Sequence, residues 1–142
     1  MKTKKTENLL QDAFQRYYKR ELLRPQEVVN TELLILRIIS LNPHVTQRKI
    51  SKSLGISLGK TNYVIKSFIL KGFIKLQNFK KANNKKAYKY LLTKQGAKEK
   101  LELAECFLVY KVAEYDRIKN DITKLTHEIK SLNKDYDSNI LR

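Results

Sequence analysis

The chain has 142 residues, 42% of them hydrophobic, and a formal net charge of +16 from 30 Lys and Arg against 14 Asp and Glu. This length allows one small core plus an extended element, and no apolar run reaches the roughly 18 residues typical of a transmembrane helix. The lone cysteine, Cys106, cannot form an intramolecular disulfide, and the two histidines lack metal-ligand spacing. We therefore expect a cytoplasmic protein with no membrane segment, metal or cofactor.

The positive charge is concentrated in the middle of the chain. Residues 33–98 hold 15 Lys and Arg and no Asp or Glu, whereas residues 1–32 carry +2 and residues 99–142 carry −1. Charge that served only solubility would include acids, so this pattern indicates a surface that binds a polyanion such as nucleic acid. The alternative is a solvated basic surface of no particular function.

The first predicted element is an amphipathic helix from about Glu7 to Leu23, stopped by Pro25, within an N-terminal segment of residues 1–25. Its aromatic side chains offer a stacking surface for bases, but packing against another helix is the more common use of this spacing. The next element, about Gln26–Leu41, is too apolar for a surface helix and is predicted to be buried.

Asn42-Pro43 ends that helix, because proline disfavours helical geometry at the residue before it. The next two residues, His44-Val45, are predicted to form a short edge strand. We interpret His44 as structural rather than catalytic.

Residues 46–71 have the pattern of a helix-turn-helix. Thr46 can cap a first helix, and Gly55 can adopt the positive φ that ends it. Ser57 can cap a second helix from about Leu58 to Lys71, and so short a turn makes two helices cross steeply. The predicted inward positions of the second helix are Thr61, Val64, Ile65, Phe68 and Ile69, and its exposed face is Gly59, Lys60, Asn62, Tyr63, Lys66 and Ser67.

Two segments rich in β-favouring residues, Phe73–Phe79 and Tyr88–Leu92, are predicted to pair as an antiparallel hairpin. The connection at residues 80–86 places four lysines around Asn83-Asn84, a dipeptide that tolerates a tight turn. A charge run is usually a solvated loop. Beside a helix-turn-helix, however, a basic hairpin tip is positioned to contact phosphates or the minor groove, as a wing does.

The last predicted element is one long helix over residues 96–136, which Thr93 can cap, followed by a frayed tail at 137–142. Apolar residues recur at alternating steps of three and four, which favours a coiled coil, and Lys111 alone interrupts them. No core of this size covers such a helix, so a second copy is expected to supply the other half. The predicted dimerisation residues are Leu101, Ala104, Leu108, Tyr115, Ile118, Ile122, Leu125, Ile129 and Leu132.

The strings Leu54-Gly55-Ile56-Ser57 and Lys71-Gly72-Phe73-Ile74 have the spacing seen in MarR-type winged-helix regulators. The run from Ile56 to Tyr63, with Asn78-Phe79-Lys80 and the segment 87–93, resembles the small members of that type labelled EPS-associated, found with exopolysaccharide genes. The likeness covers residues 33–132. It implies a bacterial transcription regulator that binds duplex DNA as a dimer and associates through its long C-terminal helix.

The predicted fold is mainly α with a small β-hairpin (α+β), comprising a winged helix-turn-helix at 26–95 and a coiled-coil helix at 96–136. We predict a homodimeric, sequence-specific regulator, usually a repressor, with helix 58–71 in the major groove of a palindromic operator on double-stranded DNA. The sequence contains no catalytic motif, so an enzyme is not expected. The predicted DNA contacts are Thr46, Gln47, Arg48, Ser57, Gly59, Lys60, Asn62, Tyr63, Lys66, Lys80, Lys81, Asn83, Asn84, Lys85 and Lys86.

A second interpretation belongs to a different functional class. In it the winged helix is a basic interaction module that binds nucleic acid without sequence preference, and the coiled coil recruits another protein. Asn62 and Tyr63 can hydrogen-bond to base edges, and they favour the regulator. Selection from random duplexes separates the two interpretations, because only a sequence-specific regulator enriches one site.

Overall fold

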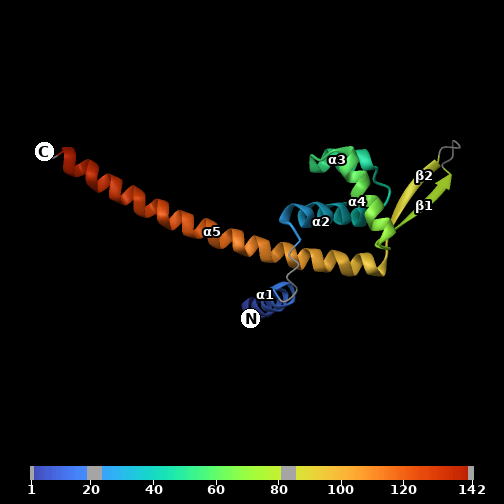
Figure 1. Ribbon diagram of the computed structural model, residues 1–142, viewed down its shortest axis with the longest axis horizontal. Helices are drawn as coiled ribbons and strands as arrows, with labels where there is room; N and C mark the ends of the chain where they lie inside the picture. Colours follow the sequence, from blue (N-terminus) through green and yellow to red (C-terminus); the bar gives the residue numbers. More distant parts are fainter. Residues whose placement is uncertain (1, 19–23, 81–85, 141–142) are drawn as a thin grey trace. The chain divides into compact units, whose positions relative to one another are not determined.

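The computed structural model describes residues 2–18, 24–80 and 86–140 (Figure 1). It divides into two units, Met1–Phe107 and Leu108–Arg142. The mainly helical fold with one antiparallel hairpin is confirmed. Its elements are α1 (Lys2–Tyr18), α2 (Gln26–Leu41), α3 (Gln47–Leu54), α4 (Leu58–Leu70), β1 (Ile74–Lys80), β2 (Lys86–Leu92) and α5 (Lys94–Ile140).

Helix α1 begins five residues before the predicted start at Glu7. Among the described side chains of its apolar stripe, Ala13 is only 1% exposed and Leu10 is half-buried, whereas Leu9 is 60% exposed. The aromatic side chains of α1 are not described, and the predicted end of the helix at Leu23 lies outside the described residues.

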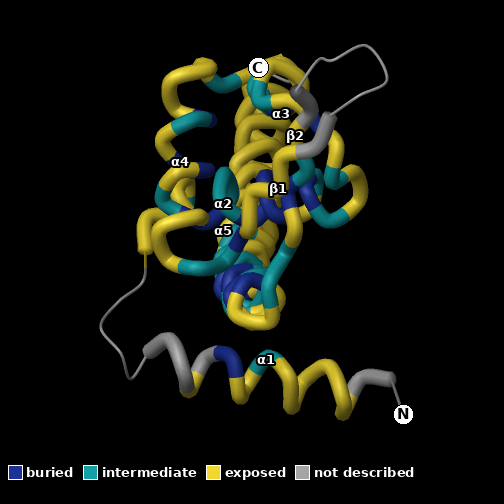
Figure 2. Tube along the Cα trace, turned by 90° about the vertical axis from the view of Figure 1, so that its right-hand side faces the viewer, coloured by how far each residue is buried: buried dark blue, intermediate teal, exposed yellow. Residues whose placement is uncertain are grey.

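The core of the first unit is built on α2, which has the predicted bounds. Val29, Leu33, Leu36 and Ile39 are buried on it, at the three- and four-residue steps of one helical face (Figure 2). Phe68 of α4 is also buried, and its ring centroid lies 6.1 Å from that of Phe73 at a tilt of 53°. Full burial stabilises each such side chain by about 1.5–3 kcal/mol. The ring contact ties α4 to the turn that leads into β1.

The predicted strand at His44-Val45 is wrong. Val45 N donates to Asn42 O at 3.1 Å and His44 N donates to Asn42 Oδ1 at 3.2 Å, so a turn uses the donors that a strand would offer. Pro43 has no N–H, and its carbonyl accepts a single bond of 2.9 Å from Tyr90 N. This one bond joins the end of α2 to the hairpin.

The hairpin pairs Ile74 with Leu92, Leu76 with Tyr90, and Lys80 with Lys86. Ile74 and Tyr90 are buried at its base, whereas Asn78 and Tyr88, farther out on the same face, are exposed. The hairpin therefore projects beyond the core, as Figure 1 shows.

The start of α5 is locked to the turn that follows α4. Thr93 Oγ1 donates to Gly72 O at 2.5 Å and to Phe73 O at 3.1 Å, and it accepts from Gly96 N at 3.0 Å. A Cβ on Gly96 would overlap the carbonyl oxygen of Phe73, so only glycine allows this approach. Thr93 thus caps α5, as predicted, and also holds the base of the hairpin.

In the second unit, helix α5 continues to Ile140, past the predicted end at Tyr136. From Tyr115 to Tyr136 the seven apolar residues of the heptad pattern are between 50% and 67% exposed. On the part of α5 that belongs to the first unit, Leu101 is exposed, whereas Ala104 is half-buried. None of the described helices is long and apolar enough to cross a membrane.

Candidate nucleic-acid interface

Helices α3 and α4 are joined by three residues, and each helix begins with a capping side chain. Thr46 Oγ1 accepts from Lys49 N at 3.2 Å, and Ser57 Oγ accepts from Lys60 N at 3.0 Å. Gly55 ends α3 with a φ of 65°, the left-handed conformation that glycine adopts without a Cβ penalty. The local sequence therefore dictates the helix-turn-helix.

The inward face of α4 matches the prediction at four of the five predicted positions. Thr61, Val64, Ile65 and Phe68 are buried, but Ile69 is 36% exposed and is not an inward residue. At 100° per residue, Ile69 lies at the edge of the stripe that the other four define.

The opposite face of α4 carries the predicted contact residues. Gly59, Lys60 and Lys66 are exposed, Tyr63 is 76% exposed, and Asn62 is half-buried. This face combines side chains that can hydrogen-bond to base edges with cations that can neutralise phosphates, and Gly59 leaves room for a backbone to approach.

The predicted contacts at the start of α3 have partners within the protein. Thr46 is exposed but uses its hydroxyl oxygen as a cap, and Ser57 does the same for α4. Gln47 Nε2 donates to Tyr90 Oη at 3.4 Å, which links α3 to β2, whereas Arg48 is exposed. Gln47 therefore has a structural partner that its sequence position did not reveal.

For the wing, the structure describes less than the sequence predicts. Lys80 and Lys86 face each other at the outer ends of β1 and β2, and their side chains are not described. The remaining predicted wing contacts lie outside the described residues, namely Lys81, Asn83, Asn84 and Lys85.

Several exposed cations near this surface were not among the predicted contacts. Lys49 and Lys52 are exposed on α3, Lys71 is exposed after α4, and Lys75 is exposed on β1. The absence of acids from residues 33–98 could have identified them, because it makes every lysine in that range a candidate phosphate contact.

The two acids that flank the basic segment both pair with the same arginine. Arg24 Nη1 lies 3.0 Å from Glu32 Oε2 and 2.6 Å from Glu99 Oε1, and Glu99 is buried. Burial raises the pKa of Glu32, although Arg24 and then Lys71 act to lower it. These carboxylates thus share one half-exposed cation, and sequence alone did not pair Arg24 with a residue 75 positions away.

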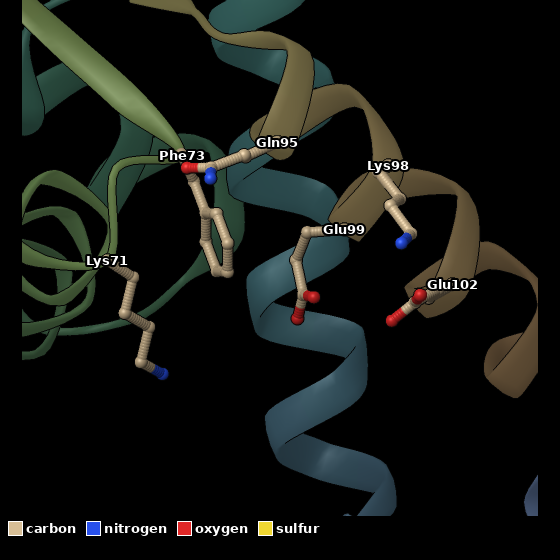
Figure 3. Close-up of a pocket in the computed structure, with 6 residues that line it drawn as sticks. All are labelled: Lys71, Phe73, Gln95, Lys98, Glu99 and Glu102. Atoms are coloured by element: carbon tan, nitrogen blue, oxygen red, sulfur yellow. The ribbon is translucent and has the colours of Figure 1, made fainter.

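A hollow of about 280 Å³ is lined by Lys71, Phe73, Gln95, Lys98, Glu99 and Glu102 (Figure 3). Its charges are mixed, and Glu99 is already paired with Arg24. Nearby, Cys106 is buried, and burial raises the pKa of its thiol, so the thiolate is disfavoured. Within the described ranges, no group of three His, Cys, Asp or Glu side chains is placed to hold a metal.

Comparison with known proteins identifies the same domain. A family model for winged helix-turn-helix DNA-binding matches residues 30–75. No curated protein matches the chain.

Several solved structures are similar to this chain, and three of them are described below. The first, smu.1704 from Streptococcus mutans UA159, has a TM-score of 0.57 and 22% identity, covering 69% of this chain and 94% of its own. The PcaV transcriptional regulator from Streptomyces coelicolor has a TM-score of 0.50 and 13% identity, and the match covers 92% of this chain and 98% of that one. A MarR transcriptional regulator from Methanosarcina mazei Go1 has a TM-score of 0.49 and 18% identity, and the match covers 70% of this chain and 73% of that one.

At these identities, the likeness establishes the fold alone. The predicted winged helix-turn-helix is confirmed, and the resemblance to MarR-type regulators holds at the level of this fold. The family-model match and the geometry together identify a winged helix-turn-helix domain. The link to exopolysaccharide genes stays a prediction.

Proposed function

We propose that this protein is a homodimeric, sequence-specific regulator of transcription that acts as a repressor at a palindromic operator. The observation that carries the proposal is the outer face of α4, where Asn62 and Tyr63 stand between Lys60 and Lys66 in a segment without acids. On a recognition helix, side chains near the N-terminus reach base edges while flanking cations hold phosphates.

The charge distribution supports duplex DNA as the ligand. Fifteen basic residues and no acid occupy residues 33–98, which span α3, α4 and the hairpin. Each phosphate that such a surface neutralises releases a counterion, which supplies affinity without sequence preference. Sequence preference then depends on the base-directed side chains of α4. The lysines around the hairpin tip fit a wing that contacts phosphates or the minor groove.

The dimer is supported by the second unit. Its apolar residues from Tyr115 to Tyr136 are exposed at coiled-coil spacing, and a second copy offers the same seam. Two copies of a helix-turn-helix read two half-sites about one helical turn apart, which accounts for the proposed palindrome.

The test is selection from random duplexes, followed by footprinting on the enriched site. A palindromic consensus supports the regulator. Absence of any enrichment would leave a basic module that binds nucleic acid without sequence preference. Placing the enriched site between a promoter and a reporter then tests repression, because occupancy there should lower transcription.

The variant Asn62→Ala assigns the reading face. It should cost about 1–3 kcal/mol on the selected site and leave affinity for random duplex nearly unchanged, since a base-directed hydrogen bond is lost. Asn120→Ala is the matched control, because Asn120 is an exposed amide on the second unit. If Asn62→Ala and Tyr63→Ala both keep the parent ratio of specific to random binding, α4 is not the reading helix.

A further inference from the structure

The heptad pattern of the second unit carries information about how two copies pair. With Ile118 as a d position, the a positions are Tyr115, Ile122, Ile129 and Tyr136, and the d positions are Ile118, Leu125 and Leu132. All seven are exposed. Resting on the dimer proposed above, we infer that the partner of this seam is a second copy of the same helix, aligned parallel and in register, in a two-stranded coiled coil.

The first argument is the shape of the seam. In a parallel dimer, a residues pack against a residues and d against d, and β-branched side chains at a with leucine at d favour two strands. Ile122 and Ile129 at a, with Leu125 and Leu132 at d, follow this rule in the centre of the seam.

The second argument is charge. The four g positions that flank the seam are all acidic: Glu114, Asp121, Glu128 and Asp135. The e positions are Lys119, Thr126, Asn133 and Ile140, so that flank has no acid.

The two helix directions place these flanks differently. In a parallel pair, each g residue faces the e residue five positions later on the other chain. Glu114 then faces Lys119 of the second copy, and no acid faces an acid. In an antiparallel pair, g faces g in every heptad register, so acids oppose acids along the whole seam and repel one another. The acidic flank therefore disfavours the antiparallel alternative.

The third argument is where the chain enters the coil. Leu108–Ile140 is a helix of 33 residues, about 50 Å long at 1.5 Å per residue. Two parallel copies receive their first units at the same end. Antiparallel copies would receive them about 50 Å apart, which exceeds the roughly 34 Å between half-sites one turn apart on one duplex.

Disulfide trapping tests the direction in the full-length protein. Ile122→Cys, at an a position, and Leu132→Cys, at a d position, are oxidised separately and as a mixture, with Asn120→Cys and Lys134→Cys as controls on the outer face of the helix. The parent protein controls for Cys106, which is 3% exposed. In a parallel pair each of these residues faces its own copy at about the Cα separation of 4.4–6.8 Å that a disulfide needs, whereas residues 122 and 132 on one helix lie about 15 Å apart. In an antiparallel pair an a residue faces a d residue, so residue 122 can face residue 132 of the other copy.

The expected result is a covalent dimer from each seam variant alone and none from the controls. Cross-linking only in the mixture would show an antiparallel pair and overturn the inference. A further variant, with Gly-Gly-Cys added after Arg142, leaves the seam intact and should also cross-link to itself if the pair is parallel.

The outcomes separate this inference from the proposed function. A dimer by light scattering that none of these cysteines traps would place the subunit contact elsewhere, overturning the coil but keeping a dimeric regulator. A monomer by light scattering would overturn both the coil and the proposed dimer, while the duplex selection would still report on sequence-specific binding.

Discussion

Replacing Thr93 by valine should destabilise the first unit by about 2 kcal/mol. The Thr93 hydroxyl donates one proton, shared between Gly72 O and Phe73 O, and it accepts from Gly96 N at the start of α5. Loss of a helix cap costs about 1 kcal/mol, and loss of one further part-buried hydrogen bond costs about 1 kcal/mol. Valine keeps the shape of threonine, so the difference reports the hydroxyl rather than a cavity.

Urea unfolding followed by circular dichroism measures this difference, at one protein concentration because dimer stability depends on concentration. Thr93→Ser retains the hydroxyl and should stay within about 0.5 kcal/mol of the parent, since serine caps helices at least as well as threonine. The reasoning is refuted if Thr93→Val unfolds at the parent midpoint, or if Thr93→Ser loses as much as Thr93→Val.

Three further outcomes are expected. DNA affinity should fall by roughly 10³ to 10⁵ between 50 and 200 mM salt, as about 6–10 phosphate contacts per dimer imply, and a flat response in a binding titration would exclude the electrostatic mechanism. Ile122→Asp with Leu125→Asp should give a monomer by light scattering, because pairing would bury unpaired carboxylates, and an unchanged mass would contradict the seam. Burial raises the pKa of Glu32, so the stability gained from its protonated form is present below the ordinary glutamate pKa and is lost as pH rises through the folded-state value. The free energy of unfolding of the parent should therefore fall relative to that of Glu32→Gln as pH rises from about 4, and parallel pH profiles would contradict this assignment.

The parts of the fold that local chemistry determines could be predicted from the sequence. Thr46, Gly55 and Ser57 specify a helix end and two helix starts within a few residues, and the structure has all three. Signals of this kind depend on neighbours in the chain and need no tertiary contact.

The strand predicted at His44-Val45 failed for a local reason, because Asn42 accepts from the backbone N–H groups of both residues. The other failures concern positions that a distant residue decides. The link from Gln47 to Tyr90 joins residues 43 positions apart, and the ion pair of Arg24 with Glu99 is likewise invisible to periodicity. Ile69 was misjudged because burial at the edge of a helical stripe depends on what packs beside it.

The charge of residues 33–98 and the charge of residues 99–142 have different consequences for binding. Residues 33–98 exclude acids, so the whole winged helix can approach a polyanion. Residues 99–142 carry a net −1, and the g flank of the proposed coil has only acids, so the charges of this helix favour one direction of pairing. A lysine in place of Asp121 or Glu128 would remove part of the repulsion that disfavours the antiparallel pair, so such a variant should select the parallel direction less strongly in the disulfide test.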